Sequence, residues 1–171
     1  MQFKGLATAK NHIVVWNGKI VKVFEMIVNQ NSQNLDEKII KEEKGNFTCA
    51  AFSCAIYEQN IYTLEPSKVN VRTFQGTVKQ VIQFTENEGD PFLATINGTF
   101  LAVGTTQGVV KVYDLSRREA KAVGGSINLK QKLPNFDVLK DLGISCDGNK
   151  VTMTVIKVIF FIFIFIYIDL I

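Results

Sequence analysis

The chain is poor in the residue types that mark several protein classes. Among its 171 residues are three cysteines and one histidine, which excludes a disulfide-dense scaffold and leaves few ligands for a metal site. The net charge of +3 at pH 7 is too small to indicate a basic face that binds nucleic acid. The first ten residues lack the apolar core of a secretory signal peptide. We therefore expect a cytosolic chain with reduced thiols.

Hydrophobic residues are plentiful but unevenly distributed. They make up 47% of the chain, against 20% charged residues, which predicts a packed core and not a disordered chain. The mean hydropathy is +0.14, and much of this excess lies in residues 158–171. From Val158 to Ile168 the sequence is VIFFIFIFIYI. A helix of these residues would be about 16 Å long, against a hydrocarbon core of about 30 Å, whereas the alternation of Ile and Phe favours a strand.

The apolar tail has two further interpretations. An abrupt change to Phe, Ile, Tyr and Leu after Lys157 is typical of translated AT-rich noncoding DNA, so we favour the hypothesis that residues 158–171 are intron read-through and lie outside the fold. The alternative is a WD-like fragment that residues 155–171 anchor to a membrane. Transcript sequencing across codon 157 separates the two, because a spliced, in-frame junction there would identify the tail as intronic.

Short β-rich runs separated by turn residues fill residues 3–157. Asn17-Gly18, Asn97-Gly98 and Asp147-Gly148 are two-residue hairpin signals, since such turns need residues that tolerate positive φ. Helical periodicity of useful length is missing from the sequence. The polar and charged stretch 29–46 is interpreted as a loop insertion.

Three of these runs repeat one pattern. Val21–Glu25, Val69–Thr73 and Val110–Asp114 align with offsets of 48 and 41 residues, and four-stranded units of about 40 to 50 residues are the signature of β-propeller blades. The third run, VKVYD, stands where a WD repeat has its Trp-Asp pair. We therefore predict an all-β chain, an incomplete WD40-like β-propeller of about three blades plus part of a fourth, with an apolar C-terminal tail.

Two stretches go beyond general WD-repeat sequence. They are RTFQGTVKQ, from Arg72 to Gln80, and DLSRREAK, from Asp114 to Lys121. Together with Trp16–Gly18, Ile61–Pro66 and Phe84–Pro91, they resemble the intraflagellar transport protein 140 family over roughly residues 10–157, within that family's second propeller.

The resemblance implies a function without catalysis. Members of that family are scaffold subunits of intraflagellar transport complex A, which acts in retrograde intraflagellar transport and cilium assembly. The implied partners are the other complex A subunits, and the implied location is the cilium, at its axoneme and base, and the cytoplasm. The family's first propeller and helical repeats are not in this sequence.

The sequence offers little chemistry for a catalytic or ligand site. His12 opens a strand without a sequence-evident nucleophile, so we expect a structural or solvent-facing role, and the C-x4-C spacing of Cys49 and Cys54 is not a common zinc spacing. We expect no catalytic residue, cofactor, metal, small-molecule substrate or nucleic acid, and no membrane contact unless the tail is an anchor. A basic cluster remains, which is either a solvated loop or a contact for an acidic partner surface; its residues are Arg117, Arg118 and Lys121.

Overall fold

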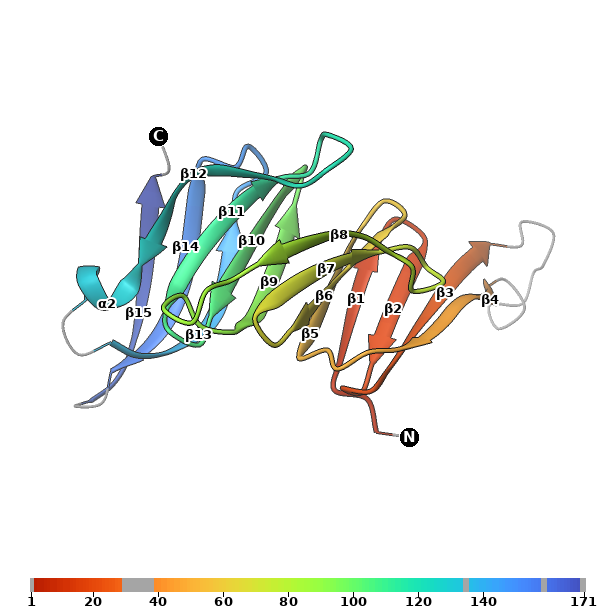
Figure 1. Ribbon diagram of the computed structural model, residues 1–171, viewed down its shortest axis with the longest axis horizontal. Helices are drawn as coiled ribbons and strands as arrows, with labels where there is room; N and C mark the ends of the chain where they lie inside the picture. Colours follow the sequence, from red (N-terminus) through yellow and green to blue (C-terminus); the bar gives the residue numbers. More distant parts are fainter. Residues whose placement is uncertain (1, 29–38, 134–135, 158–159, 170–171) are drawn as a thin grey trace. The chain divides into compact units, whose positions relative to one another are not determined.

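The computed structural model of the chain describes residues 2–28, 39–133, 136–157 and 160–169. Contacts group the chain into two compact units. Unit 1 comprises Met1–Thr63 and Asn70–Val81, and unit 2 comprises Leu64–Val69 and Ile82–Ile171. The regular elements of the described residues are strands apart from one short helix, and the strands form four sheets in which they follow one another in chain order (Figure 1).

The first sheet belongs to unit 1 and has the order β1-β2-β3-β4. Each pair of neighbours in it is antiparallel. Its strands are β1 (Gly5–Ala9), β2 (His12–Trp16), β3 (Ile20–Val28) and β4 (Ile39–Thr48). The β2–β3 connection is the predicted Asn17-Gly18 turn, where Gly18 takes φ +89°, and the side chain of Asn17 accepts a hydrogen bond from the Ile20 amide at 2.8 Å.

The second and third sheets have four strands each, with the orders β5-β6-β7-β8 and β12-β11-β10-β9. The strands of the second are β5 (Ser53–Tyr57), β6 (Asn60–Glu65), β7 (Lys68–Arg72) and β8 (Val78–Gln83). Those of the third are β9 (Pro91–Asn97), β10 (Phe100–Thr105), β11 (Val109–Asp114) and β12 (Lys121–Asn128). A four-residue helix, α2 (Leu129–Lys132), follows β12.

The fourth sheet has three strands in the order β13-β14-β15. They are β13 (Phe136–Ile144), β14 (Lys150–Lys157) and β15 (Phe160–Asp169). The predicted Asp147-Gly148 turn joins β13 to β14, with Gly148 at φ +73°. Three four-stranded sheets and one of three strands agree with the prediction of about three blades plus part of a fourth.

The repeat seen in the sequence is the third strand of each complete sheet. Val21–Glu25 lies in β3, Val69–Thr73 overlaps β7, and Val110–Asp114 lies in β11. The apolar positions of this pattern are buried in all three strands, with Val21, Val69 and Val110 each 0% exposed. The periodicity therefore reports a buried strand face that recurs once in each blade.

Each unit has its own apolar core. In unit 1, the first sheet packs on residues of β5 and β6 in a cluster made of Val14, Trp16, Val21, Val23, Ala51, Cys54, Ile56 and Ile61. In unit 2, β10, β11 and the start of α2 pack on β13 and β14 in a cluster made of Ala102, Val110, Val112, Ile127, Leu129, Leu139, Leu142, Ile144, Val151, Met153 and Val155. In β2, β3, β5, β11 and β14 these side chains come from alternate residues, as sheets packed on one face require.

The structure corrects the predicted loop insertion at residues 29–46. Residues 29–38 lie outside the described part, but Ile39–Asn46 belong to β4, which pairs with β3 from Ile20↔Thr48 to Val28↔Ile39. β4 lies at the edge of the sheet, where Lys41, Glu42 and Glu43 are exposed and such charges discourage pairing with other chains. Backbone pairing with β3 here outweighs the low strand propensity of Lys and Glu.

Within the apolar tail, Phe160–Asp169 form a strand. Phe160–Asp169 pair with β14 in an antiparallel register that includes Val151↔Ile168 and Val155↔Ile164, as the Ile and Phe alternation favours. The expectation that residues 158–171 lie outside the fold does not agree with this pairing. The hypothesis of an intronic origin concerns the gene and stays a prediction.

Candidate protein-interaction site

The basic cluster predicted from the sequence lies between β11 and β12. Arg117 and Arg118 are exposed in the connecting turn, and Lys121 is the exposed first residue of β12. Together with Glu119 and Ala120 they line a surface concavity of about 330 Å³. We call residues 115–121 the Arg117 loop. The structure thus gathers all three predicted residues around one hollow.

The Arg117 loop is held by its first residues. Leu115 is 5% exposed, and its amide donates to the Thr99 carbonyl at 2.7 Å. The Ser116 amide donates to Asp114 Oδ1 at 2.8 Å. This bond, helped by the Ser116 hydroxyl and the charge of Arg117, lowers the pKa of Asp114. A buried leucine and an aspartate therefore fix the point from which the basic residues project.

The cations of this loop are not consumed by ion pairs with the described part of the chain. The ion pairs found there join other residues, Lys22 with Glu43, Lys44 with Glu25 and Glu42, and Lys111 with Glu88. Exposed guanidinium groups carry five N–H donors in a fork that matches carboxylates. The loop can therefore offer its donors to an acidic surface.

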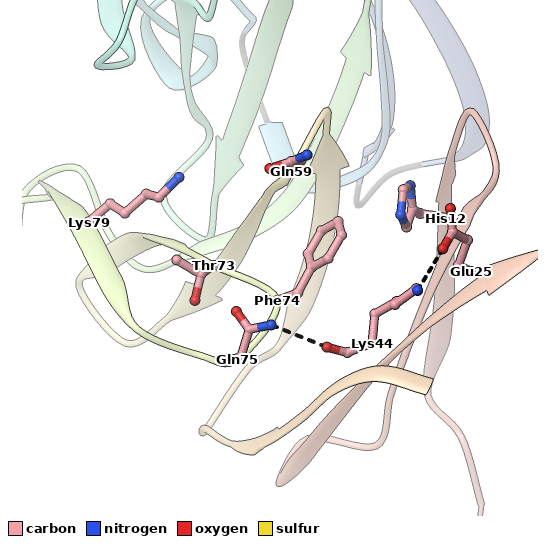
Figure 2. Close-up of a pocket in the computed structure, with 8 residues that line it drawn as sticks. All are labelled: His12, Glu25, Lys44, Gln59, Thr73, Phe74, Gln75 and Lys79. Carbon is pink, nitrogen blue, oxygen red and sulfur yellow. Dashed lines mark hydrogen bonds and ion pairs between the residues drawn. The ribbon is translucent and has the colours of Figure 1, made fainter. Parts of the chain in front are cut away.

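A second concavity, which the sequence did not reveal, lies within unit 1. Its volume is about 400 Å³, and Figure 2 shows the side chains around it. We call it the His12 pocket. Its lining comes from β2, β3, β4, the β5–β6 turn, the β7–β8 turn and β8: His12, Glu25, Lys44, Gln59, Thr73, Phe74, Gln75 and Lys79.

An ion-pair bridge forms one wall of the His12 pocket. Glu25 and Glu42 are direct cross-strand neighbours on β3 and β4, where like charges repel. Lys44 Nζ lies 2.9 Å from Glu25 Oε2 and 2.7 Å from Glu42 Oε2. These contacts, Glu42 first, raise the pKa of Lys44, and the Lys44 hydrogen bond lowers the pKa of Glu25. The lysine thus offsets the repulsion of the two carboxylates.

A β-bulge places Lys44 where it can form this bridge. The β3–β4 register runs from Val23↔Gly45 to Phe24↔Glu43, so Lys44 is the extra residue on β4. Bulges redirect a side chain that regular pairing would aim elsewhere. The next residue, Gly45, lies so close to the β7–β8 turn that a Cβ there would be 1.8 Å from the Phe74 carbonyl oxygen. Glycine is what permits this close approach.

The histidine and two of the cysteines lie in apolar or aromatic surroundings. His12 is half-buried, with its ring centroid 4.9 Å from that of Phe74, and Cys54 is buried in the apolar core of unit 1 with Cys49 packed against it. The described residues include no group of three or more His, Cys, Asp or Glu side chains that could hold a metal ion. Among those residues, no helix has the length and apolar character to cross a membrane.

Comparisons with known proteins agree with this architecture. A family model described as the IFT140 second beta-propeller matches residues 1–168, which include most of the apolar tail. Among solved structures, the chain is similar to Hsv2 of Kluyveromyces marxianus, with 15% identity, a TM-score of 0.58 and coverage of 91% of this chain and 46% of that one. It is also similar to HIRA(644-1017), with 12% identity, a TM-score of 0.50 and coverage of 88% and 51%.

At these identities the structural likenesses show the fold alone. This chain spans about half the length of those structures. Together with the four antiparallel sheets and the matching family model, they show an all-β fold consistent with a partial WD-type β-propeller. The predicted fold class is confirmed.

Proposed function

Since the chain belongs to the IFT140 second β-propeller family, we propose that it is a non-catalytic scaffold subunit of intraflagellar transport complex A. It acts through protein–protein contacts in retrograde intraflagellar transport and cilium assembly, in the cilium, at its axoneme and base, and in the cytoplasm. Its partners are the other complex A subunits. The family match over residues 1–168 is the observation that carries this proposal.

The Arg117 loop is the contact surface that we propose for an acidic face of one of those subunits. Arg117 and Arg118 in the anchored turn and Lys121 at the start of β12 surround a hollow of about 330 Å³. Charge-assisted hydrogen bonds from arginine to carboxylate are about twice as strong as neutral ones. Two arginines and one lysine this close together suit a partner that presents several Asp or Glu side chains.

Affinity purification from ciliated cells tests both statements. The tagged chain should recover the other complex A subunits, and the Arg117→Glu, Arg118→Glu double variant should recover about tenfold less, because reversal replaces attraction by repulsion across the contact. The matched control is Lys140→Glu, which reverses an exposed charge on β13.

Equal recovery by the double variant would contradict the role of the loop. Consistent absence of complex A subunits from the wild-type purification would contradict the scaffold function itself. A carbonate-resistant membrane pool of the wild-type chain would instead support the tail-anchor alternative for residues 155–171.

A further inference from the structure

The His12 pocket has the size of a ligand site but the exposure of a protein-contact site. A volume of about 400 Å³ lies at the low end of the range for pockets that hold small molecules, which bury most of their ligand. Gln59, Gln75 and Lys79 on its lining are exposed. A ligand bound among them remains partly exposed to solvent, as a docked peptide segment does.

Charges are separated across the pocket. On one wall, Glu25 has both carboxylate oxygens engaged, Oε1 by Asn11 Nδ2 at 2.7 Å and Oε2 by Lys44 at 2.9 Å. Lys44 also pairs with Glu42, which is not part of the pocket lining, so one ammonium group is shared by the carboxylate of this wall and by a second carboxylate beside it. Figure 2 shows Lys79 apart from this wall, with Phe74 between them.

Lys79 is the cation that the pocket leaves available. Its Nζ donates to Asn60 Oδ1 at 2.7 Å, which fixes the ammonium group at the pocket edge and uses one of its three donors. Asn60 directly follows Gln59, whose exposed amide lines the same pocket. The edge therefore offers an ammonium group and an amide to an incoming anion.

Phe74 and His12 supply the apolar part of the pocket. Their rings are tilted by 51° at a centroid distance of 4.9 Å. Phe74 also packs against the apolar core of unit 1. Packing against the core fixes the Phe74 ring in place, and a fixed aromatic surface favours contact with an apolar side chain.

We propose that the His12 pocket binds a peptide segment in which an acidic residue adjoins an apolar one. The carboxylate pairs with Lys79, and the apolar side chain lies on Phe74 and His12. The Glu25–Lys44–Glu42 bridge keeps the opposite wall in shape and repels a second carboxylate. This inference shares with the proposed function only the premise that the chain works by protein contacts.

Nuclear magnetic resonance titration of the isotope-labelled 171-residue chain tests the proposal. The probe is a pentapeptide in which one glutamate is flanked by two leucines, and its matched control carries glutamine instead. The glutamate peptide should shift the amide signals of Thr73–Gln75 and Lys79, and the glutamine peptide should bind about tenfold more weakly, since the charge-assisted hydrogen bond is lost.

Variants define the contribution of each part of the pocket. Lys79→Glu should lower the affinity for the glutamate peptide by at least about tenfold, and Lys79→Gln by less. Phe74→Ala should lower the affinity for both peptides. The matched control is Lys19→Glu, an exposed lysine in the β2–β3 turn at the other end of β2 from His12, which should bind as the wild type does.

Three results would overturn the proposal: equal binding of the two peptides, signal shifts that map away from the pocket, or unchanged affinity in a folded Lys79→Glu chain. Binding of phosphatidylserine vesicles without binding of the peptide would also overturn it and indicate a lipid ligand. Recovery of complex A subunits by Lys79→Glu is measured in parallel, so failure of this proposal and failure of the proposed function are distinguishable.

Discussion

The His12 pocket and the Arg117 loop use charged residues in opposite ways. In the pocket, Lys44 lies within 3 Å of two carboxylates that would otherwise repel each other across β3 and β4. In the loop, Arg117, Arg118 and Lys121 enter none of the ion pairs found in the described part of the chain. The charges of the pocket shape its surface, whereas the charges of the loop are available to bind a partner.

This difference separates two kinds of surface that a scaffold needs. Exposed ion pairs contribute little to stability, so the Glu25–Lys44–Glu42 bridge matters mainly because it fixes the wall of a pocket. The cations of the loop enter none of the ion pairs in the described part of the chain, and their effect appears when an acidic surface arrives. Removing a charge of the bridge should therefore change the pH dependence of stability, whereas reversing Arg117 and Arg118 should change partner binding.

The largest effect is expected at the anchor of the Arg117 loop. Leu115 is 5% exposed, so Leu115→Ala should lower the free energy of unfolding by about 3 kcal/mol, through lost burial and the cavity left behind. Urea denaturation followed by circular dichroism measures it. Glu119→Ala, at an exposed position of the same loop, is the control and should stay within about 0.5 kcal/mol. Similar losses in both variants would show that the loop is not held by its leucine.

A smaller effect is expected where β4 meets the β7–β8 turn. Gly45→Ala should lower the free energy of unfolding by about 2 kcal/mol, because its Cβ would meet the Phe74 carbonyl oxygen at 1.8 Å and the backbone must shift. The matched control is Gly125→Ala in β12, where a Cβ meets nothing within 4 Å. The two variants are compared by urea denaturation. Gly45→Ala should also lower the affinity for the glutamate peptide in the titration. Equal stability of the two variants would mean that the backbone at Gly45 and Phe74 can shift without a loss of free energy of unfolding.

The features that could be predicted from the sequence are those that depend on residues close together in the chain. The Asn-Gly and Asp-Gly turns and the recurring apolar positions of β3, β7 and β11 depend on residues a few positions apart, so pattern alone places them. The basic cluster was found for the same reason, since Arg117, Arg118 and Lys121 are near neighbours in the chain. Its concave arrangement around residues 117–121 became visible in the structure.

The His12 pocket could not be found in this way. Its residues are spread from His12 to Lys79 and meet because sheet pairing and the β7–β8 turn bring them together. Its central cation, Lys44, sits in a charged stretch that resembles a loop, and a one-residue bulge in the pairing with β3 decides its direction. Neither the pairing nor the bulge leaves a local signal, because both depend on the partner strand.

The smallest predicted effect is the pH dependence that Glu25 contributes. The pKa of Glu25 is lowered in the folded chain, chiefly by the hydrogen bond from Lys44. Its stabilising contribution is therefore present above the unfolded pKa of a glutamate, about 4.3, and is lost as the pH falls through the lowered folded value. Thermal unfolding of the wild type and Glu25→Gln from pH 3 to pH 7 should give melting temperatures that differ near neutrality and converge on acidification.

Salt should distinguish this contribution from that of Asp114 in the Arg117 loop. The pKa of Asp114 is also lowered, but chiefly by the backbone hydrogen bond from Ser116. At 1 M salt the screening length is about 3 Å, so the difference between the wild type and Glu25→Gln should shrink, whereas that between the wild type and Asp114→Asn should change less. Equal salt sensitivity of the two differences would contradict the contrast, because the pocket carboxylate is held by a charge and the loop carboxylate by a local hydrogen bond.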